Sequence, residues 1–129
     1  MMKVLTDWLV TEIAAAVPGA DIKVGAMPVG NGIGVYAAAN AVDAEYMTRS
    51  RNIGIKYSVS CKDSIQANAF MNLIKVHERL TLRREYAVAG DDWHIRWVRS
   101  GSMPVYAGTE EDGRYIYGSS IEISIYKEN

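Results

Sequence analysis

The chain has 129 residues, of which 49% are hydrophobic and 22% charged, and this composition predicts a single globular domain over residues 1–129. Its formal net charge of −1 argues against a strong overall field for nucleic acid or an anionic membrane and leaves room only for local patches. The single cysteine excludes an internal disulfide and a multi-cysteine zinc site, and it favours an intracellular setting.

The first predicted element is an amphipathic helix over residues 3–17, which Pro18 and Gly19 end. Its apolar stripe consists of Leu5, Trp8, Leu9, Ile13 and Ala16. Asp7 and Glu12 interrupt the apolar positions, so the segment is a poor signal peptide. Apolar stretches in the chain fall short of the roughly 18–20 residues that a membrane span requires, and we expect no membrane partner.

A short strand is predicted over residues 21–27, with Ile22 and Val24 on one face, followed by a glycine-rich turn over 28–34 and a weak strand from Gly34. The turn glycines would allow positive φ and a tight chain reversal. The alternative is a phosphate-binding loop. The Gly30-x-Gly32-x-Gly34 spacing departs from GxGxxG, and no P-loop lysine follows it, so the turn is preferred.

Residues 39–51 show no clear period and are interpreted as a loop. Arg49 and Arg51 make a small basic spot in it. Because long loops in compact domains are often functional, these two arginines are candidates for contact with a partner.

Residues 53–61 alternate in the manner of a half-buried strand, with Cys61 on the apolar face as a small core residue rather than a nucleophile. Asp63 and Gln66 then have the spacing of a capping box at the start of a second helix. Its apolar stripe is Ala69, Leu73, Val76 and Leu80. His77 lies late in that helix, where a positive charge suits the helix dipole, and no metal-ligating residue accompanies it.

Three strands are predicted after the second helix. The first covers residues 92–99 and places Trp93, Ile95 and Trp97 on one face, with His94 and Arg96 on the other. The second begins at Pro104 and leads to the acidic turn from Glu110 to Gly113. The third returns over 114–126 with Ile121, Ile123 and Ile125 on one face, and Gly118 in it predicts a bend or bulge.

These elements predict an α+β fold in which a mixed, mostly antiparallel β-sheet packs against two α-helices, in the order helix, strands, helix, strands, with a C-terminal hairpin. The sequence contains no paired histidines, CxxC, GxSxG, HExxH, Walker loop or calcium loop. We therefore expect no catalytic residues, no metal and no cofactor. A structural or binding protein is favoured over an enzyme.

The C-terminal hairpin resembles the end of the tail terminator proteins of long-tailed bacteriophages, also called tail completion or minor capsid proteins. The matching residues are Pro104, Gly108, Gly113, Arg114, Tyr115 and Tyr117. The N-terminal LTDWLV, the short strand ending in GAMP and the helix after YSVSC follow in the same order as in that family. The resemblance covers most of the chain as a layout, with the loop over 39–51 unmatched.

The resemblance implies a virion protein of the tail that assembles in the cytoplasm of the bacterial host and catalyses no reaction. Such proteins form a ring homo-oligomer, commonly a hexamer, on the end of the tail tube. The ring stops tube polymerisation and presents the surface that joins the tail to the head. The implied partners are other copies of the chain, the tail tube protein and the head–tail connector protein. DNA contacts the ring only in passing through its pore.

The candidate interface residues, toward a neighbouring subunit or the tail tube, are Arg49, Arg51, Tyr106, Glu110, Glu111, Asp112, Arg114, Tyr115 and Tyr117. Two alternatives stay open at this point. One is another phage neck or head-completion protein. The other is a small ligand-binding or enzymatic α+β domain that uses the loop from Gly30 to Gly34.

Overall fold

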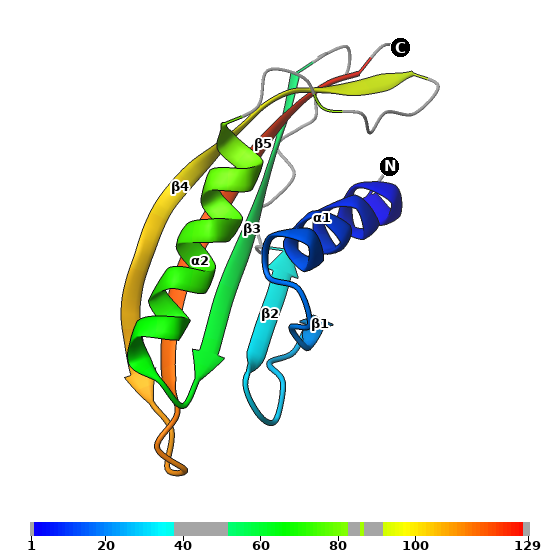
Figure 1. Cartoon of the computed structure of the whole chain (residues 1–129). Coiled ribbons are helices and arrows are strands. Elements are labelled where there is room, and N and C mark those ends of the chain that lie inside the picture. The colour runs from blue at the N-terminus through cyan, green and yellow to red at the C-terminus, as the bar shows by residue number, and fades with distance from the viewer. Residues whose placement is uncertain (1, 38–51, 83–85, 87–91, 128–129) are drawn as a thin grey trace.

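The computed structural model describes residues 2–37, 52–82, 86 and 92–127, which form two helices and one five-stranded sheet (Figure 1). The elements are α1 (Met2–Ala16), β1 (Ile22–Val24), β2 (Gly32–Ala37), β3 (Asn52–Asp63), α2 (Gln66–Thr81), β4 (Trp93–Thr109) and β5 (Tyr115–Lys127). The sheet order is β1-β2-β3-β5-β4. Only β1 and β2 pair in parallel, and the other three pairs are antiparallel. The predicted α+β fold class and element order are confirmed.

The centre of the sheet is the pair β3 and β5, whose register runs without a shift from Asn52 opposite Tyr126 to Asp63 opposite Tyr115. Alternate residues of both strands are buried against α1 and α2, so both helices cover the same face. The buried residues of the two strands are Ile55, Tyr57, Val59, Cys61, Ile121, Ile123 and Ile125. The predicted apolar stripes of both helices close this core, as expected from their spacing.

The predicted capping box is wrong. β3 continues to Asp63, and α2 begins only at Gln66, after a cap residue, Ile65, that makes no side-chain capping bond. Asp63 instead accepts a hydrogen bond from the Ile65 backbone N–H at 2.8 Å, and the Gln66 side chain donates to the Tyr117 hydroxyl at 3.0 Å. The spacing of the two residues was right for a cap, but the strand occupies the positions that the cap would need.

The prediction that His77 interacts as a cation with the dipole of α2 is also corrected. The side chain is 2% exposed, and its Nδ1 lies 2.6 Å from the Ser100 hydroxyl of β4. Burial lowers the pKa of His77 below its usual value, which favours the neutral ring. Within the described part of the chain, its Nε2 has no hydrogen-bond partner.

The two strands predicted over 92–99 and from Pro104 are one strand, β4, whose 17 residues run beside the 13 of β5. Four register shifts absorb the difference in length, and β4 curves strongly (Figure 1). The first shift, between Ile95 and Trp97, moves Trp97 to the opposite face and leaves Val98 buried in its place. The bulge predicted at Gly118 therefore lies on β4, because β5 stays in register with β3 there.

The glycine-rich segment also differs from the prediction. Gly32 and Gly34 belong to β2, and positive φ occurs earlier, at Gly25 (φ 78°). A Cβ on Gly32 would lie 2.4 Å from the Asp21 carbonyl oxygen, so the glycine permits close packing of β1 and its following loop on β2. β1 is also shorter than predicted, and Val24 is exposed.

We predict that Gly32→Ala destabilises the fold, because the added methyl overlaps backbone that cannot move without displacing β1. The expected loss is about 1–3 kcal/mol in the free energy of unfolding. Gly30→Ala is the matched control in the same segment, since the nearest atom to its Cβ is an Arg114 side-chain nitrogen at 3.8 Å. Urea denaturation measures both variants, and equal stability of the two would contradict this packing role.

We predict that the contribution of neutral, buried His77 to the free energy of unfolding is complete above about pH 6.5, the usual pKa of histidine, and decreases as the pH falls below that value. The lowered pKa of His77 means that the unfolded chain takes up this proton before the folded one. Urea denaturation across this range tests the prediction in His77→Gln, which should lose the dependence. His94→Gln, which changes the only other histidine, should retain it. An unchanged pH dependence in His77→Gln contradicts the assignment.

Candidate functional site

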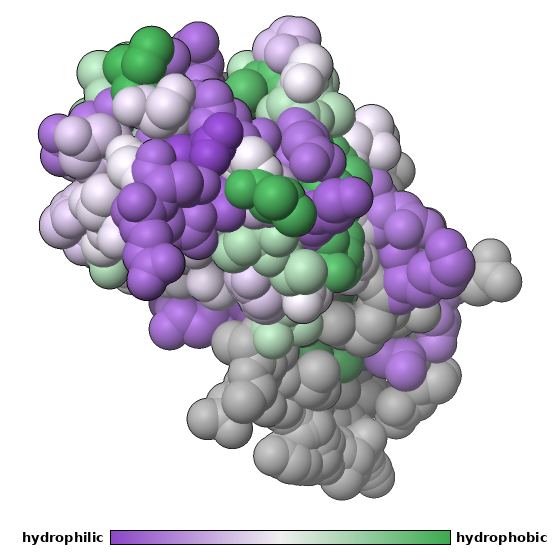
Figure 2. Space-filling view, turned by 90° about the horizontal axis from the view of Figure 1, so that it is seen from below, coloured by the Kyte–Doolittle hydropathy of each residue, from purple (hydrophilic) through white to green (hydrophobic). Residues whose placement is uncertain are grey.

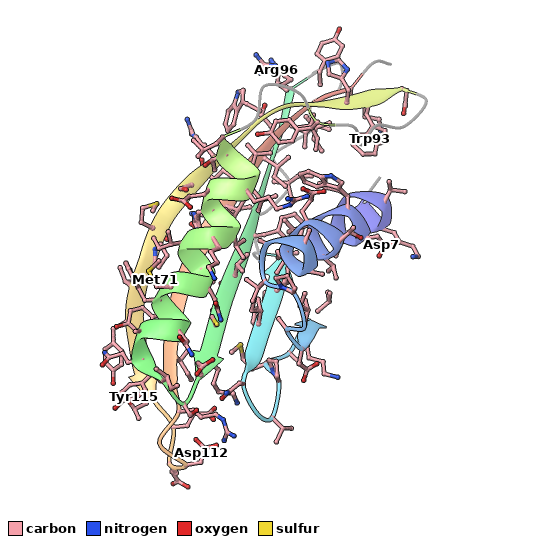
Figure 3. All side chains as sticks on the ribbon, in the orientation of Figure 1. Asp7, Met71, Trp93, Arg96, Asp112 and Tyr115 are labelled. Carbon is pink, nitrogen blue, oxygen red and sulfur yellow. The ribbon has the colours of Figure 1, made fainter. Side chains whose placement is uncertain are left out.

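The candidate site is the turn that joins β4 and β5. The Glu110 backbone N–H donates to the Arg114 carbonyl at 2.8 Å, and the Gly113 N–H donates to the Glu110 carbonyl at 2.9 Å. Gly113 has φ 88°, a conformation that glycine adopts without steric cost. The predicted turn is confirmed, and it ends the hairpin at the same end of the molecule as Tyr115 and Asp112 (Figure 3).

An ion pair joins this turn to the central strand. The Lys62 ammonium of β3 lies 3.0 Å from a Glu110 carboxylate oxygen. The Lys62 side chain is 4% exposed and that of Glu110 is 37% exposed. A buried ammonium without a counter-charge is costly, so Glu110 stabilises a charge that the fold has already removed from water.

A second link runs through Arg114 to the loop between β1 and β2. The Arg114 Nε donates to Asn31 Oδ1 at 2.8 Å, and the same oxygen accepts from the Ser64 backbone N–H at 3.1 Å. Asp112 accepts from the backbone N–H and the guanidinium of Arg114, and these bonds lower the pKa of that carboxyl. Three segments distant in sequence therefore meet at the turn.

The hairpin aromatic residues lie on the helix side of the sheet. The Tyr117 ring packs edge-on between Phe70 of α2 and Tyr106 of β4, with both pairs of ring centroids 5.8 Å apart. Tyr117 is partly buried against the core, whereas Tyr106 is 54% exposed. Tyr115 is half-buried, opposite Asp63 and Thr109 in the neighbouring strands.

The structure thus separates the predicted interface residues into two groups. Glu110, Asp112, Arg114 and Tyr117 make contacts within the chain, and Tyr115 is half-buried. Glu111 is exposed, and Tyr106 is exposed over about half its surface although its ring packs against Tyr117. Arg49 and Arg51 lie outside the described residues. The sequence pattern missed Lys62 and Asn31. A lysine at the polar positions of an alternating strand gives no signal that a distant turn will cover it.

Exposed apolar side chains occur at both edges of the sheet. On the β4 side they are Phe70, Met71, Met103, Val105 and Tyr106, and near β1 they are Val24 and Val29. Seen from below, hydrophobic residues form small separate patches among hydrophilic ones (Figure 2). The two edges thus present different surfaces. One is a long irregular strand beside α2, and the other is a strand of three residues.

Metal-binding side chains do not cluster in the part of the chain that the structure describes. No cluster of three His, Cys, Asp or Glu side chains there could hold a metal ion, and no helix is long and apolar enough to cross a membrane. Burial raises the pKa of the Cys61 thiol to about 11, which disfavours the reactive thiolate. The features on which an interaction would depend are the exposed hairpin end and the edges of the sheet.

We predict that Glu110→Gln destabilises the protein by about 1–2 kcal/mol, because it leaves the buried Lys62 ammonium without its counter-charge. Glu111→Gln is the matched control, because the Glu111 carboxylate is next in sequence, is exposed and makes no bond to Lys62. Chemical denaturation of both variants tests the ion pair. Lys62→Met combined with Glu110→Gln should recover part of the loss, and equal effects of the two glutamine variants would contradict the assignment.

No protein-family model matches the chain, and no curated protein sequence matches it. A solved structure described as "Virion of native gene transfer agent (GTA) particle" contains a chain of similar fold. The superposition has a TM-score of 0.61 and covers 92% of this chain and 91% of that chain, at 13% sequence identity. At this identity the similarity establishes a shared fold over nearly the full length of both chains.

Proposed function

We propose that this protein is a structural component of a virion and, within it, the tail terminator that caps the tail tube as a ring. The observation that carries the proposal is the shared fold with a chain of a virion over more than nine-tenths of both chains. The resemblance of the C-terminal hairpin to tail terminator proteins supports the finer assignment.

The arrangement of the sheet edges is compatible with a ring. A cyclic ring requires heterologous contacts, in which one surface of each subunit meets a different surface of the next. The β4 and β1 edges differ in length and shape, and both carry exposed apolar side chains. Within the described residues β4 has no strand on its outer side, and an edge of this kind would be a liability if it stayed exposed. A contact between the β4 edge of one copy and the β1 edge of the next would cover both.

The hairpin end is the part of the subunit that we assign to the tail tube. Glu110 and Arg114 hold the turn in one orientation through Lys62 and Asn31. Tyr106 and Glu111 remain exposed beside it. A surface held by the fold loses little conformational entropy on binding, which suits a docking contact. The same ring would present its other end to the head–tail connector protein and let DNA pass.

We predict that the purified protein co-sediments with tail tubes and forms a closed ring there, which mass measurement and electron microscopy detect. Tyr106→Ala and Glu111→Lys should each weaken tube binding about tenfold, equivalent to roughly 1.4 kcal/mol. Glu111 is exposed, so its variant should keep the stability of the wild type. Tyr106→Ala also removes a ring contact with Tyr117 and a hydrogen bond with Thr109, so urea denaturation must show that this variant is folded under the assay conditions.

Asp7→Lys on α1 is the control for Glu111→Lys, because it makes the same charge change at an exposed site away from the hairpin end (Figure 3). A wild-type protein that stays monomeric at high concentration and does not bind tubes would overturn the proposal. Binding to a head–tail connector but not to tubes would favour a neck or head-completion protein instead.

A further inference from the structure

One face of the sheet is not covered by either helix, and most of its described residues are polar, small or aromatic, with Ile116 and Val105 near the hairpin end as aliphatic exceptions. The pairing register places three rows of residues across β3, β5 and β4 at one end of this face. The rows are Asn52–Tyr126–His94, Gly54–Ser124–Trp97 and Lys56–Glu122–Arg99. A fourth row, Ser58–Ser120–Ser102, follows toward the middle of the sheet. No large aliphatic side chain interrupts these four rows, so the surface can be approached closely.

Cations alternate with aromatic rings in this region, which we name the basic-aromatic patch. Its members are Lys56, His94, Arg96, Trp97, Arg99 and Tyr126. The Arg99 guanidinium lies 4.5 Å from the centroid of the Trp97 ring, and the His94 and Tyr126 rings are 5.4 Å apart. The first bulge of β4 turns Arg96 toward this face, where its Nη1 is 3.4 Å from the Ser124 hydroxyl.

The charge of the face is one-sided. On this face the described strand residues include five basic ones, Lys23, Lys56, Lys62, Arg96 and Arg99, and one acidic one, Glu122. Lys62 and Lys23 each lie near a carboxylate, of Glu110 and Asp21 respectively, at 3.0 and 3.9 Å. Arg99 bonds to Glu122 at 2.8 Å but keeps 65% of its side chain exposed. Lys56 and Arg96 are exposed and make no ion pair within the described residues.

We propose that the basic-aromatic patch contacts the phosphate backbone of double-stranded DNA. From His94 to Arg99 the patch is roughly 17 Å long and about 10 Å wide across three strands. B-form DNA carries one negative charge per about 1.7 Å of its axis, so several phosphates can lie over the patch at once. The partly neutralised Arg99 and the small number of free cations make the contact weak and independent of base sequence.

The inference assigns the surface of the subunit that DNA would contact while it passes through the proposed ring. It rests on the proposed function only because that passage would bring DNA to the patch. The bulge end of β4 lies far from the hairpin end assigned to the tail tube, as the positions of Arg96 and Asp112 show (Figure 3). The two surfaces can therefore be tested separately.

The test is the titration of a fluorescein-labelled duplex with the purified protein, read by fluorescence anisotropy at two salt concentrations. Two to three phosphate contacts predict that affinity falls about 100-fold for a tenfold rise in salt. Lys56→Glu and Arg96→Glu should each lower the affinity at least about tenfold at low salt, whereas duplexes of unrelated sequence should bind equally. Lys75→Glu on the exposed side of α2 makes the same charge change and should retain binding.

Three outcomes would overturn the proposal. It is overturned if the wild-type protein does not bind the duplex at low salt, or if Lys75→Glu loses as much affinity as Lys56→Glu. It is also overturned if Lys56→Glu reduces self-association and leaves DNA binding unchanged, since the patch would then be a subunit contact. Co-sedimentation with tail tubes should be unchanged in both patch variants. DNA binding without tube binding would count against the proposed function and leave this inference standing.

Discussion

The fold depends on the unbroken ladder between β3 and β5, in which twelve residue pairs keep one register. Because side chains alternate along a strand, this register puts the large apolar residues of both strands on one face, with Ile116 as the exception. That face requires a cover, and α1 and α2 both supply it. The opposite face receives mainly serine, glycine, charged and aromatic residues. β4 joins the ladder from outside and adapts to it by bulging.

The sequence predicted the elements whose period is strong and local. Both helices, β3 and β5 show clear spacing, and the structure has them within a few residues. It could not predict that β4 is continuous, because Gly101, Ser102 and Pro104 have the composition of a break. Strict alternation predicts Trp97 on the same face as Trp93 and Ile95, and a bulge determined by pairing with β5 moves it to the opposite face. Such shifts depend on a partner strand that lies later in the chain.

The same limit applies to the hairpin turn. Its acidic residues have the composition of solvated charges, and the ion pair of Glu110 depends on Lys62, 48 residues earlier. The bond of Arg114 to Asn31 spans 83 residues. No periodicity within either segment records these contacts. Their effect is to fix the orientation of the turn, so that its remaining exposed groups form a defined surface. A turn that was only solvated would have to be ordered during binding, at a cost in entropy.

Although the net charge is only −1, opposite charges are separated along the β4–β5 hairpin. Carboxylates lie at the turn, and cations lie at the other end, on the sheet face that neither helix covers. A protein that had to hold DNA tightly would concentrate many unpaired cations on one surface. Here Glu122 sits between Lys56 and Arg99 and offsets part of their charge. In the DNA contact that we propose, such a face would attract phosphates and release them readily. For a ring through which DNA must move, a weak contact that repeats on every subunit is more useful than a strong one, because each phosphate can exchange between neighbouring cations without a large barrier.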